Sequence, residues 1–376
     1  MKVALITTSN AANYGAVLQA YALKMAIINM GHSCDIIDYR PETLGNGRRL
    51  VFRSFNIKLV FHSLKNVMNF SLVKVFRKKL LVFDEFRNKY LLSGKKTYKT
   101  YEDMISDFPE YDVYICGSDQ IWNTHLTYSK VFFLRFEIIR PQAVFVAYAP
   151  SFPQVESDSD KMILRKNTKH FDYLSARESE SAELLSKITG RDVKHVIDPV
   201  FLLSKEDWQK FCIANTSVLS QEPYILIYFI GDNATGVKAA EILRKKFKLK
   251  MIEIRLSNKS NFDVDFVAET PTPQEVVSLI NSAAYICTNS FHGTAFSIIL
   301  EKKFLTIGNP KRNSRMTSLL ETAGMKDRFI TEDNLGDIEI ILPKLENNPP
   351  TKGVDALIDF SKDYLSKAIG GSKNAY

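Results

Sequence analysis

The chain has 376 residues, of which 45% are hydrophobic and 24% are charged, values typical of a globular protein. Its length favours two domains over one. No apolar run reaches the roughly 18–20 residues that span a bilayer, and the N-terminus lacks a signal-peptide cleavage pattern, so we expect a cytoplasmic protein.

The net charge of +8 arises in one segment. Between Arg48 and Lys89 there are eleven basic residues and two acidic ones, so the remainder of the chain is near neutral. This distribution argues against a nucleic-acid partner. The same segment is rich in aromatic and aliphatic residues, and two interpretations stay open. It is either a helical insertion packed on the first domain or a surface that contacts an anionic membrane at its inner, cytoplasmic face.

The cysteines indicate neither disulfides nor a metal site. Cys34, Cys116, Cys212 and Cys287 are widely spaced and form no CxxC or Cys/His cluster, so we expect buried free thiols and no metal. The chain also lacks GxGxxG after its first strand, GxxxxGK[ST], and any paired acidic cluster. These absences argue against a nicotinamide enzyme, a P-loop NTPase and a magnesium site, and we expect no cofactor.

The first half of the chain alternates strand-like and helical patterns. Residues 2–7 form an expected strand, residues 16–30 a helix that stops at Gly31, and residues 33–38 a second strand, which is a βαβ opening. Further strands are expected at 111–116, 143–148, 172–176 and 193–197, with helices within 48–92, at 100–107 and from 179 to about 188.

A crossing segment at about 205–223 separates this set from a second alternation. Its strands are expected at 224–230, 251–254, 283–287 and 304–307, and its helices at 234–247, 273–282, 296–300, 314–323 and 354–368. We therefore predict an α/β protein with two Rossmann-like doubly wound domains facing a cleft. The predicted parts are residues 1–205 with a basic helical insertion at about 48–92, residues 220–345, and a C-terminal helix and tail at 350–376.

Ligands bind beyond the carboxyl ends of the strands in such sheets. Polar segments follow five of the expected strands, and these are the candidate site segments: Asn10–Gly15, Gly117–Asn123, Arg177-Glu178, Asn289–Gly293 and Gly308–Arg315.

His292 stands at the junction of an expected strand and helix. A helix N-terminus offers backbone N–H groups and a positive dipole end to an anion, and an imidazole there can also move a proton. Asn289 and Gly293 share this turn. Ser290 and Thr294 could cap the helix instead of contacting substrate.

Three arginines are candidate anion ligands. Arg177 precedes a helix together with Glu178, and this pair is either solvent-exposed or a fork for a carboxylate or phosphate. Arg312 and Arg315 lie just before another helix, where they could neutralise an anionic donor or form a solvated face.

The acid–base and sugar-binding candidates lie near the first strands. Asp119, in a Gly-Ser-Asp turn, could be a general base or an ordinary turn residue. Asn13, Tyr14, Gln19 and Asn123 could line an acceptor pocket. Trp122 could stack on a sugar, although a buried tryptophan is the commoner case.

Five short motifs in a fixed order make the chain resemble the polysaccharide pyruvyl transferase family. They are Asn13-Tyr14-Gly15-Ala16-Val17-Leu18-Gln19-Ala20-Tyr21-Ala22-Leu23, Gly117-Ser118-Asp119-Gln120-Ile121-Trp122-Asn123, Ser175-Ala176-Arg177-Glu178, Asp198-Pro199-Val200 and Ser290-Phe291-His292-Gly293, with Asn313-Ser314-Arg315 and Leu319-Leu320 in addition.

The resemblance implies a GT-B-like pair of domains that transfers pyruvate from phosphoenolpyruvate, as a ketal, onto a sugar of a surface polysaccharide or its lipid-linked precursor. It maps the family's histidine onto His292 and an arginine of SxRE type onto Arg177. Many members carry an arginine where this chain has Ser290, so Arg315 or Arg312 would supply that cation. The implied roles are proton transfer by His292 and base action by Asp119 or Glu178.

A second function fits the same architecture. A nucleotide-sugar glycosyltransferase would need a nucleotide-diphosphate pocket in the second domain, and the turn at His292 could serve it. A glycan-assembly scaffold bound to membrane through residues 48–89 is the non-enzymatic alternative.

Overall fold

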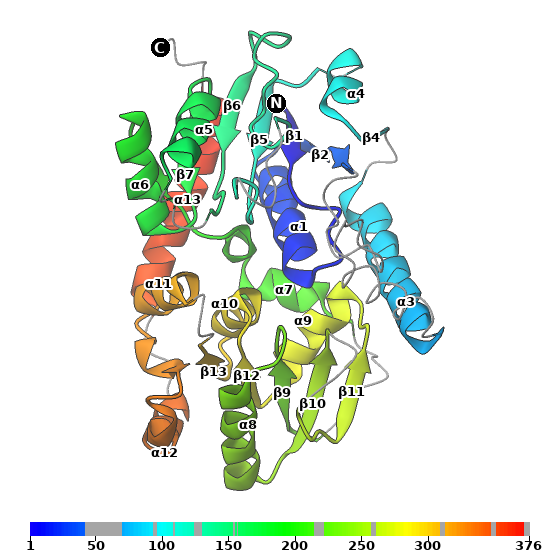
Figure 1. Ribbon diagram of the computed structural model, residues 1–376, viewed down its shortest axis with the longest axis vertical. Helices are drawn as coiled ribbons and strands as arrows, with labels where there is room; N and C mark the ends of the chain where they lie inside the picture. Colours follow the sequence, from blue (N-terminus) through cyan, green and yellow to red (C-terminus); the bar gives the residue numbers. More distant parts are fainter. Residues whose placement is uncertain are drawn as a thin grey trace. The chain divides into compact units, whose positions relative to one another are not determined.

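The computed structural model describes residues 1–41, 70–92, 96–107, 110–123, 130–152, 155, 157–213, 222–256, 261–308, 313–346 and 351–371. The chain divides into two compact units, each built on a parallel sheet of its own (Figure 1). Unit 1 comprises Met1–Arg49, Asp84–Leu203 and Asp355–Tyr376, and unit 2 comprises Leu50–Phe83 and Ser204–Val354. Residues 350–376 were predicted to lie outside both domains, but Asp355–Tyr376 groups with unit 1.

The sheet of unit 1 has the strand order β2-β1-β5-β6, and all of its pairings are parallel. Because β1 lies between β2 and β5, the chain winds in opposite directions from these two central strands. The carboxyl ends of β1 and β5 therefore form the switch point where ligands bind in open α/β sheets. The strands are β1 (Lys2–Ile6), β2 (Ser33–Ile36), β5 (Val113–Cys116) and β6 (Val144–Ala147), with two short parallel pairs, β3 (Asp38–Tyr39) with β4 (Thr97–Tyr98) and β7 (Ser175–Ala176) with β8 (Lys194–His195).

Polar side chains cap the start of several unit 1 helices. Helix α1 (Tyr14–Asn29) starts two residues earlier than the periodicity predicted, because the Asn13 side chain accepts a hydrogen bond from the N–H of Ala16 and caps it there. The other helices are α4 (Tyr101–Ser106), α5 (Asp158–Thr168), α6 (Ser179–Thr189), the 3-10 turn Pro199–Leu202 and α13 (Lys352–Gly370).

Of the predicted basic insertion, only the C-terminal part lies within the described residues. It is helical as predicted, with α3 (Phe70–Phe86) running into a π-helix at Arg87–Leu91. Within it, the guanidinium of Arg87 is fully buried and contacts the carboxylate of Asp38 at 2.6 Å. This ion pair fixes the π-helix to the short strand β3.

The core of unit 1 is rich in aromatic residues. Trp122 is 1% exposed and stacks on Phe133 at 5.4 Å between ring centroids, with Phe152 and Phe171 also in contact. Helix α13 contacts this unit at the end of β6, where the hydroxyl of Tyr364 donates to the carbonyl of Ala147 at 3.0 Å.

The sheet of unit 2 has the order β11-β10-β9-β12-β13-β14, again parallel throughout. Here the winding direction changes between β9 and β12, so their carboxyl ends form the second switch point. The strands are β9 (Tyr224–Tyr228), β10 (Lys250–Arg255), β11 (Phe266–Glu269), β12 (Tyr285–Thr288), β13 (Lys303–Ile307) and β14 (Phe329–Ile330).

Helices connect these strands. They are α7 (Lys205–Phe211), α8 (Ala234–Phe247), α9 (Pro273–Ser282), α10 (Phe291–Ile299), α11 (Ser314–Thr322), α12 (Ile338–Ile341) and the 3-10 turns Lys326–Arg328, Leu335–Asp337 and Leu342–Glu346. The predicted pair of doubly wound parallel sheets is therefore confirmed. Helices α5, α7 and α12 and strands β4, β11 and β14 were not predicted.

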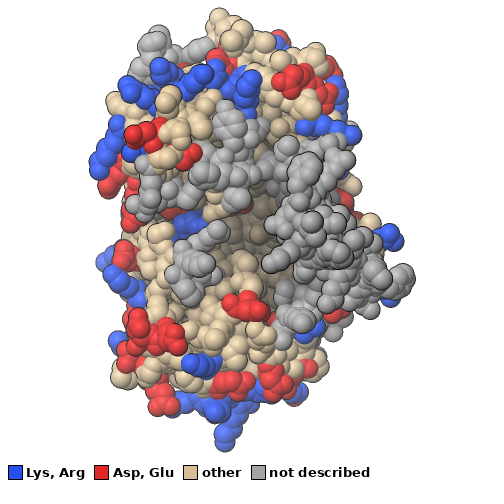
Figure 2. Space-filling view, in the orientation of Figure 1, with Lys and Arg blue, Asp and Glu red and all other residues tan. Residues whose placement is uncertain are grey.

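Figure 2 shows how charged side chains are distributed on one face of the protein. Where the face in Figure 2 is described, Lys and Arg side chains are interspersed with Asp and Glu. Among the described residues, no helix is long and apolar enough to cross a membrane.

Candidate functional site

A tight turn after β5 forms the first half of the unit 1 switch point. Gly117 has φ +143, and a Cβ atom there would lie 1.8 Å from the backbone oxygen of Tyr148, so only glycine fits. The turn carries Asp119, which also has a positive φ of 69. The Asp119 carboxylate accepts a hydrogen bond from the Thr8 hydroxyl at 3.3 Å, which joins the loops after β1 and β5.

Ser151 links this turn to the end of β7. Its N–H donates to the carbonyl of Asp119 at 2.8 Å, and its hydroxyl donates to Oε1 of Glu178 at 2.9 Å. One serine thus links the backbone carbonyl of Asp119 to the carboxylate of Glu178, two of the predicted acid–base residues.

Arg177 lies between two buried carboxylates. Its Nε donates to Glu178 at 3.1 Å and its Nη1 donates to Asp198 at 2.7 Å, with side-chain exposures of 2%, 10% and 0% for Arg177, Glu178 and Asp198. Burial by itself lowers the pKa of Arg177, but the charges of Glu178, Asp198 and Asp119 outweigh it and raise the pKa above its ordinary value.

This geometry corrects one interpretation of the Arg177–Glu178 pair. A solvent-exposed pair is wrong, because both side chains are buried. The predicted donor-binding role of Arg177 is not favoured, because two carboxylates already neutralise its positive charge.

His195 belongs to the same cluster. Burial lowers the pKa of its imidazole, and a hydrogen bond with the backbone of Arg177 and the charge of Glu178 oppose that shift only in part. The imidazole therefore lies close enough to Glu178 for that carboxylate to influence its pKa.

The predicted acceptor residues lie at this edge in different states. Asn13 is exposed and caps α1, whereas Tyr14 and Asn123 are 3% and 7% exposed. Gln19 is fully buried, and its side chain bonds Thr7, Ala16 and the N–H of Ser118 at 2.8, 2.9 and 3.2 Å.

The Gln19 side chain therefore connects the loops after β1 and β5 inside the protein, and its amide is not exposed to a substrate. The Trp122 indole is buried among rings and donates to the carbonyl of Phe132 at 3.1 Å. Of its two interpretations, the structure favours the core residue over the sugar platform.

In unit 2, Asn289 ties together the loops after β9 and β12. Its Oδ1 accepts from the N–H of Ile230 at 2.7 Å and its Nδ2 donates to the carbonyl of Ile230 at 3.1 Å. Just before it, the Thr288 hydroxyl donates to the carbonyl of Tyr228 at 2.6 Å and accepts from the N–H of Ser290 at 3.0 Å.

His292 is the second residue of α10, not a turn residue as predicted, because the helix begins sooner. The hydroxyl of Ser290 accepts from the N–H of Gly293 at 3.3 Å and caps the helix, which is the alternative that the sequence offered for it. The same alternative is wrong for Thr294, whose hydroxyl bonds Thr306 at 2.9 Å. A Cβ atom on Gly293 would lie 2.4 Å from the Thr288 hydroxyl, so glycine is required here too.

Arg315 lies at the same edge of the unit 2 sheet. It is half-buried in the first turn of α11, which follows β13, the strand next to β12, and α11 packs against α10. Helices α8, α10 and α11 carry no acidic residue in their first turns. Arg312 lies outside the described residues.

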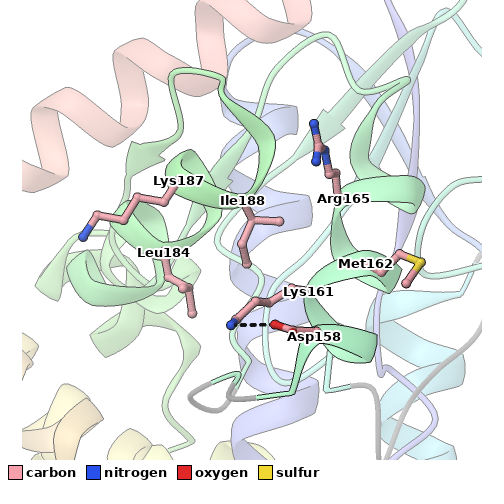
Figure 3. A pocket seen from close by; sticks show the side chains of 7 residues that line it. All are labelled: Asp158, Lys161, Met162, Arg165, Leu184, Lys187 and Ile188. Carbon is pink, nitrogen blue, oxygen red and sulfur yellow. Dashed lines mark hydrogen bonds and ion pairs between the residues drawn. The ribbon is translucent and has the colours of Figure 1, made fainter.

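One cavity of about 440 Å³ lies elsewhere, between α5 and α6 of unit 1 (Figure 3). Leu184 and Ile188 of α6 point toward Lys161 of α5, which is ion-paired with Asp158 at 3.1 Å. None of the predicted site residues lines it. Within the described ranges, no group of three or more His, Cys, Asp or Glu side chains is arranged to hold a metal ion.

Three residues of the unit 1 cluster had no predicted role. Asp198 stood in a recognised motif, Asp198-Pro199-Val200, but its partner Arg177 is 21 positions away. Ser151 followed an expected strand and could have been found by the strand-end rule. For His195, no sequence signal marks its place beside Glu178.

Comparison with protein families identifies the chain. The family model for polysaccharide pyruvyl transferase matches residues 13–311, and the chain belongs to this family. It is a transferase family that acts on polysaccharide. No curated protein sequence matches the chain significantly.

Solved structures resemble the chain in fold at low identity. The S. aureus MnaA–UDP complex aligns with a TM-score of 0.53 at 12% identity over 100% of this chain and 99% of that one. A UDP-N-acetylglucosamine 2-epimerase from Rickettsia bellii aligns with a TM-score of 0.53 at 13% identity, over 98% and 95%. The corresponding epimerase from Methanocaldococcus jannaschii gives 0.52 at 14%, over 96% and 99%. These likenesses show a GT-B fold, as the sequence predicted. The cleft expected between the two domains stays a prediction.

Proposed function

We propose that this protein transfers the pyruvyl group of phosphoenolpyruvate, as a ketal, onto two hydroxyls of one sugar in a surface polysaccharide or its lipid-linked precursor. Membership of the pyruvyl transferase family is the observation that carries the proposal. Phosphoenolpyruvate is a co-substrate in this reaction, and no cofactor is proposed.

The chemistry asks for two different kinds of subsite. The donor carries a carboxylate and a phosphate, so it needs cations and backbone N–H groups. When C3 of the donor takes a proton, C2 becomes electrophilic and a sugar hydroxyl attacks it. A second hydroxyl of the same sugar then displaces phosphate and closes the ketal. The acceptor side must therefore take protons from hydroxyls, and the donor side must stabilise negative charge.

The unit 2 edge has the chemistry of the donor subsite. The first-turn N–H groups of α10 lack intrahelical acceptors, as in any helix, and the dipole favours an anion there. His292 and Arg315 both stand in first turns at this edge, and no first-turn acid of α8, α10 or α11 opposes an anion. Ser290, with its hydroxyl used as a cap, shapes this turn instead of supplying a charge.

The unit 1 edge has the opposite character. Asp119, Glu178 and Asp198 surround Arg177, so the described cluster has a surplus of negative charge. Such a site repels phosphoenolpyruvate but suits the hydroxyls of a neutral sugar, which donate to carboxylates. This supports an acceptor subsite formed by Asn13, Tyr14 and the turn at Asp119.

The roles follow from these environments. His292 exchanges the proton on the phosphate side of the donor, and Arg315 neutralises donor charge, with Arg312 as the second candidate cation. Asp119 or Glu178 accepts the acceptor proton. Asp119 is the more exposed of the two, whereas Glu178 is held by Ser151 and Arg177.

The test is binding followed by turnover. A ligand that binds only the folded protein raises its thermal midpoint, so phosphoenolpyruvate should stabilise the chain and UDP-sugars should not. His292→Ala should lose at least about a hundredfold in ketal formation, the lower end of the range for general acid–base catalysis. His32→Ala, at the start of β2 away from the switch points, is the control. Wild-type turnover by His292→Ala would remove the imidazole from the mechanism.

A nucleotide-sugar glycosyltransferase is the second candidate. It is favoured by one observation, the GT-B likeness to a structure solved as a complex with UDP. Stabilisation by a UDP-sugar, with no effect of phosphoenolpyruvate, would select this function over pyruvyl transfer.

We also propose that α3 brings the protein to an anionic membrane surface, where lipid-linked acceptors reside. Lys74, Arg77, Lys78 and Leu81 are exposed at spacings of three and four residues, so they form one stripe with Leu81 62% exposed. Lys79 lies off this stripe, and burial lowers the pKa of its amine.

Vesicle flotation decides the membrane contact. Reversal of Lys74, Arg77 and Lys78 to Glu should abolish flotation with vesicles that contain phosphatidylserine. The matched control reverses three exposed lysines at the end of α8: Lys245, Lys246 and Lys248. Equal flotation of the α3 variant and wild type would reject the proposal.

A further inference from the structure

A chain of buried contacts runs from the C-terminal helix to the acceptor carboxylates of unit 1. The Ser361 hydroxyl of α13 accepts a hydrogen bond from the N–H of Ile197 at 2.9 Å. The next residue, Asp198, contacts Arg177 at 2.7 Å, and Arg177 contacts Glu178 at 3.1 Å. Each link is formed by a group that is nine-tenths buried or more.

Asp198 is held at both of its carboxylate oxygens. Oδ1 accepts from the N–H of Val200 at 3.1 Å and caps the 3-10 turn at Pro199–Leu202, which packs against α1. Oδ2 faces the guanidinium of Arg177. The carboxylate therefore cannot turn toward a substrate, but it defines where the guanidinium lies.

Glu178 has one oxygen committed to this cluster. Oε1 accepts from both Arg177 and Ser151, while Oε2 is buried and makes no hydrogen bond to the described residues. A carboxylate held by one oxygen has a defined orientation, and its strength as a proton acceptor depends on how much positive charge faces it.

We propose that Asp198 is a positioning residue for acceptor activation. Because Asp198 shares the positive charge of Arg177, the guanidinium does not neutralise Glu178 completely. The guanidinium that Asp198 positions also holds the Glu178 carboxylate at the edge of the sheet. This inference rests on the proposed pyruvyl transfer, and it assigns a role to the Asp198-Pro199-Val200 motif.

The inference predicts a specific kinetic signature. In Asp198→Asn, the amide oxygen still accepts the hydrogen bond from the N–H of Val200, but the negative charge is lost. The full positive charge of Arg177 then acts on Glu178. We expect kcat for ketal formation to fall by at least tenfold, while KM for phosphoenolpyruvate stays within threefold, because the donor lies on unit 2. Asp198→Glu restores the charge and should recover most of kcat.

Asp38→Asn is the matched control for a purely structural effect. Asp38 is also buried in unit 1 and ion-paired with a fully buried arginine, Arg87, but it lies outside the carboxylate cluster. Both Asn variants should lower the thermal midpoint, and only Asp198→Asn should lower kcat per folded molecule. Ser361→Ala, a milder change at the far end of the chain of contacts, should lower kcat in the same direction if Asp198→Asn does not fold.

Two outcomes overturn the inference. One is a wild-type kcat per folded molecule in Asp198→Asn, or in Ser361→Ala where that variant stands in for it. The other is an equal loss in Asp38→Asn, which would make the effect one of stability alone. A wild-type protein without pyruvyl transfer would instead refute the proposed function, so the two failures are distinguishable.

Discussion

Gly117→Ala tests the turn that carries Asp119. The added Cβ would lie 1.8 Å from the oxygen and 2.8 Å from the carbon of the Tyr148 carbonyl group, both backbone atoms that cannot rotate away. The backbone of β5 or β6 must therefore shift by more than 1 Å. That shift breaks the hydrogen bond from the N–H of Tyr148 to the carbonyl of Cys116, which is 2.9 Å long.

The magnitude follows from two contributions. Overpacking of a close contact costs about 1–3 kcal/mol. A φ of +143 is a glycine conformation, and forcing alanine into it costs about another 1–3 kcal/mol. We expect unfolding of the variant to need about 4 kcal/mol less free energy, measured by urea denaturation followed by far-ultraviolet circular dichroism.

Gly31→Ala separates the two contributions. Gly31 also has a positive φ, +85, but no atom lies within 4 Å of the position that its Cβ would take. Only the conformational cost of about 1–2 kcal/mol should appear. If Gly117→Ala costs no more than Gly31→Ala, the close approach of β5 and β6 at this turn is refuted.

Two further predictions concern stability. Burial beside Phe145 lowers the pKa of His170 to about 4, below its ordinary 6.5, so the folded protein resists protonation and loses stability as pH falls from about 6.5 to 4. The loss is on the order of 3 kcal/mol. His170→Phe should therefore reduce the fall of the urea midpoint across this interval, and an unchanged pH dependence would contradict the assignment. Ser290→Ala removes the cap of α10 and should cost about 1 kcal/mol, measured by thermal or urea unfolding, whereas a loss below about 0.3 kcal/mol would mean that the cap is not formed in solution.

Sequence patterns predicted the elements whose ends are marked by local chemistry. Helix α9 was predicted at its observed bounds, and its start at Pro273 is marked by a capping box between Thr272 and Glu275. Helix α8 was also predicted at its bounds, with Asn233 as its cap. In both cases the signal lies within a few residues of the boundary, where sequence reasoning is strongest.

Elements without such local signals were missed. Strand β11 has an exposed Phe266 and a half-buried Val267, so it lacks the apolar run of a central strand and is recognisable only as the edge of the sheet. Helix α5 is polar over most of its length and carries only Leu164 as a buried apolar residue. Tertiary position, not local pattern, specifies both.

The candidate site divides in the same way. The strand-end rule located Asp119, Glu178 and His292 at the carboxyl edges of the sheets, because that rule depends on topology that the sequence reveals. It could not show that Arg177 is balanced by Asp198, since the pair joins residues far apart in the chain through a buried contact. Charge pairing of this kind exists only in three dimensions.

The central claim is that phosphoenolpyruvate is the donor, and isotope transfer tests it most directly. Wild-type protein is incubated with phosphoenolpyruvate labelled with carbon-13 at C2 and with a glycan acceptor. The account predicts a labelled ketal carbon on the sugar and one inorganic phosphate released for each ketal formed. Label that stays in the donor, while a nucleoside diphosphate is released from an added UDP-sugar, would contradict it.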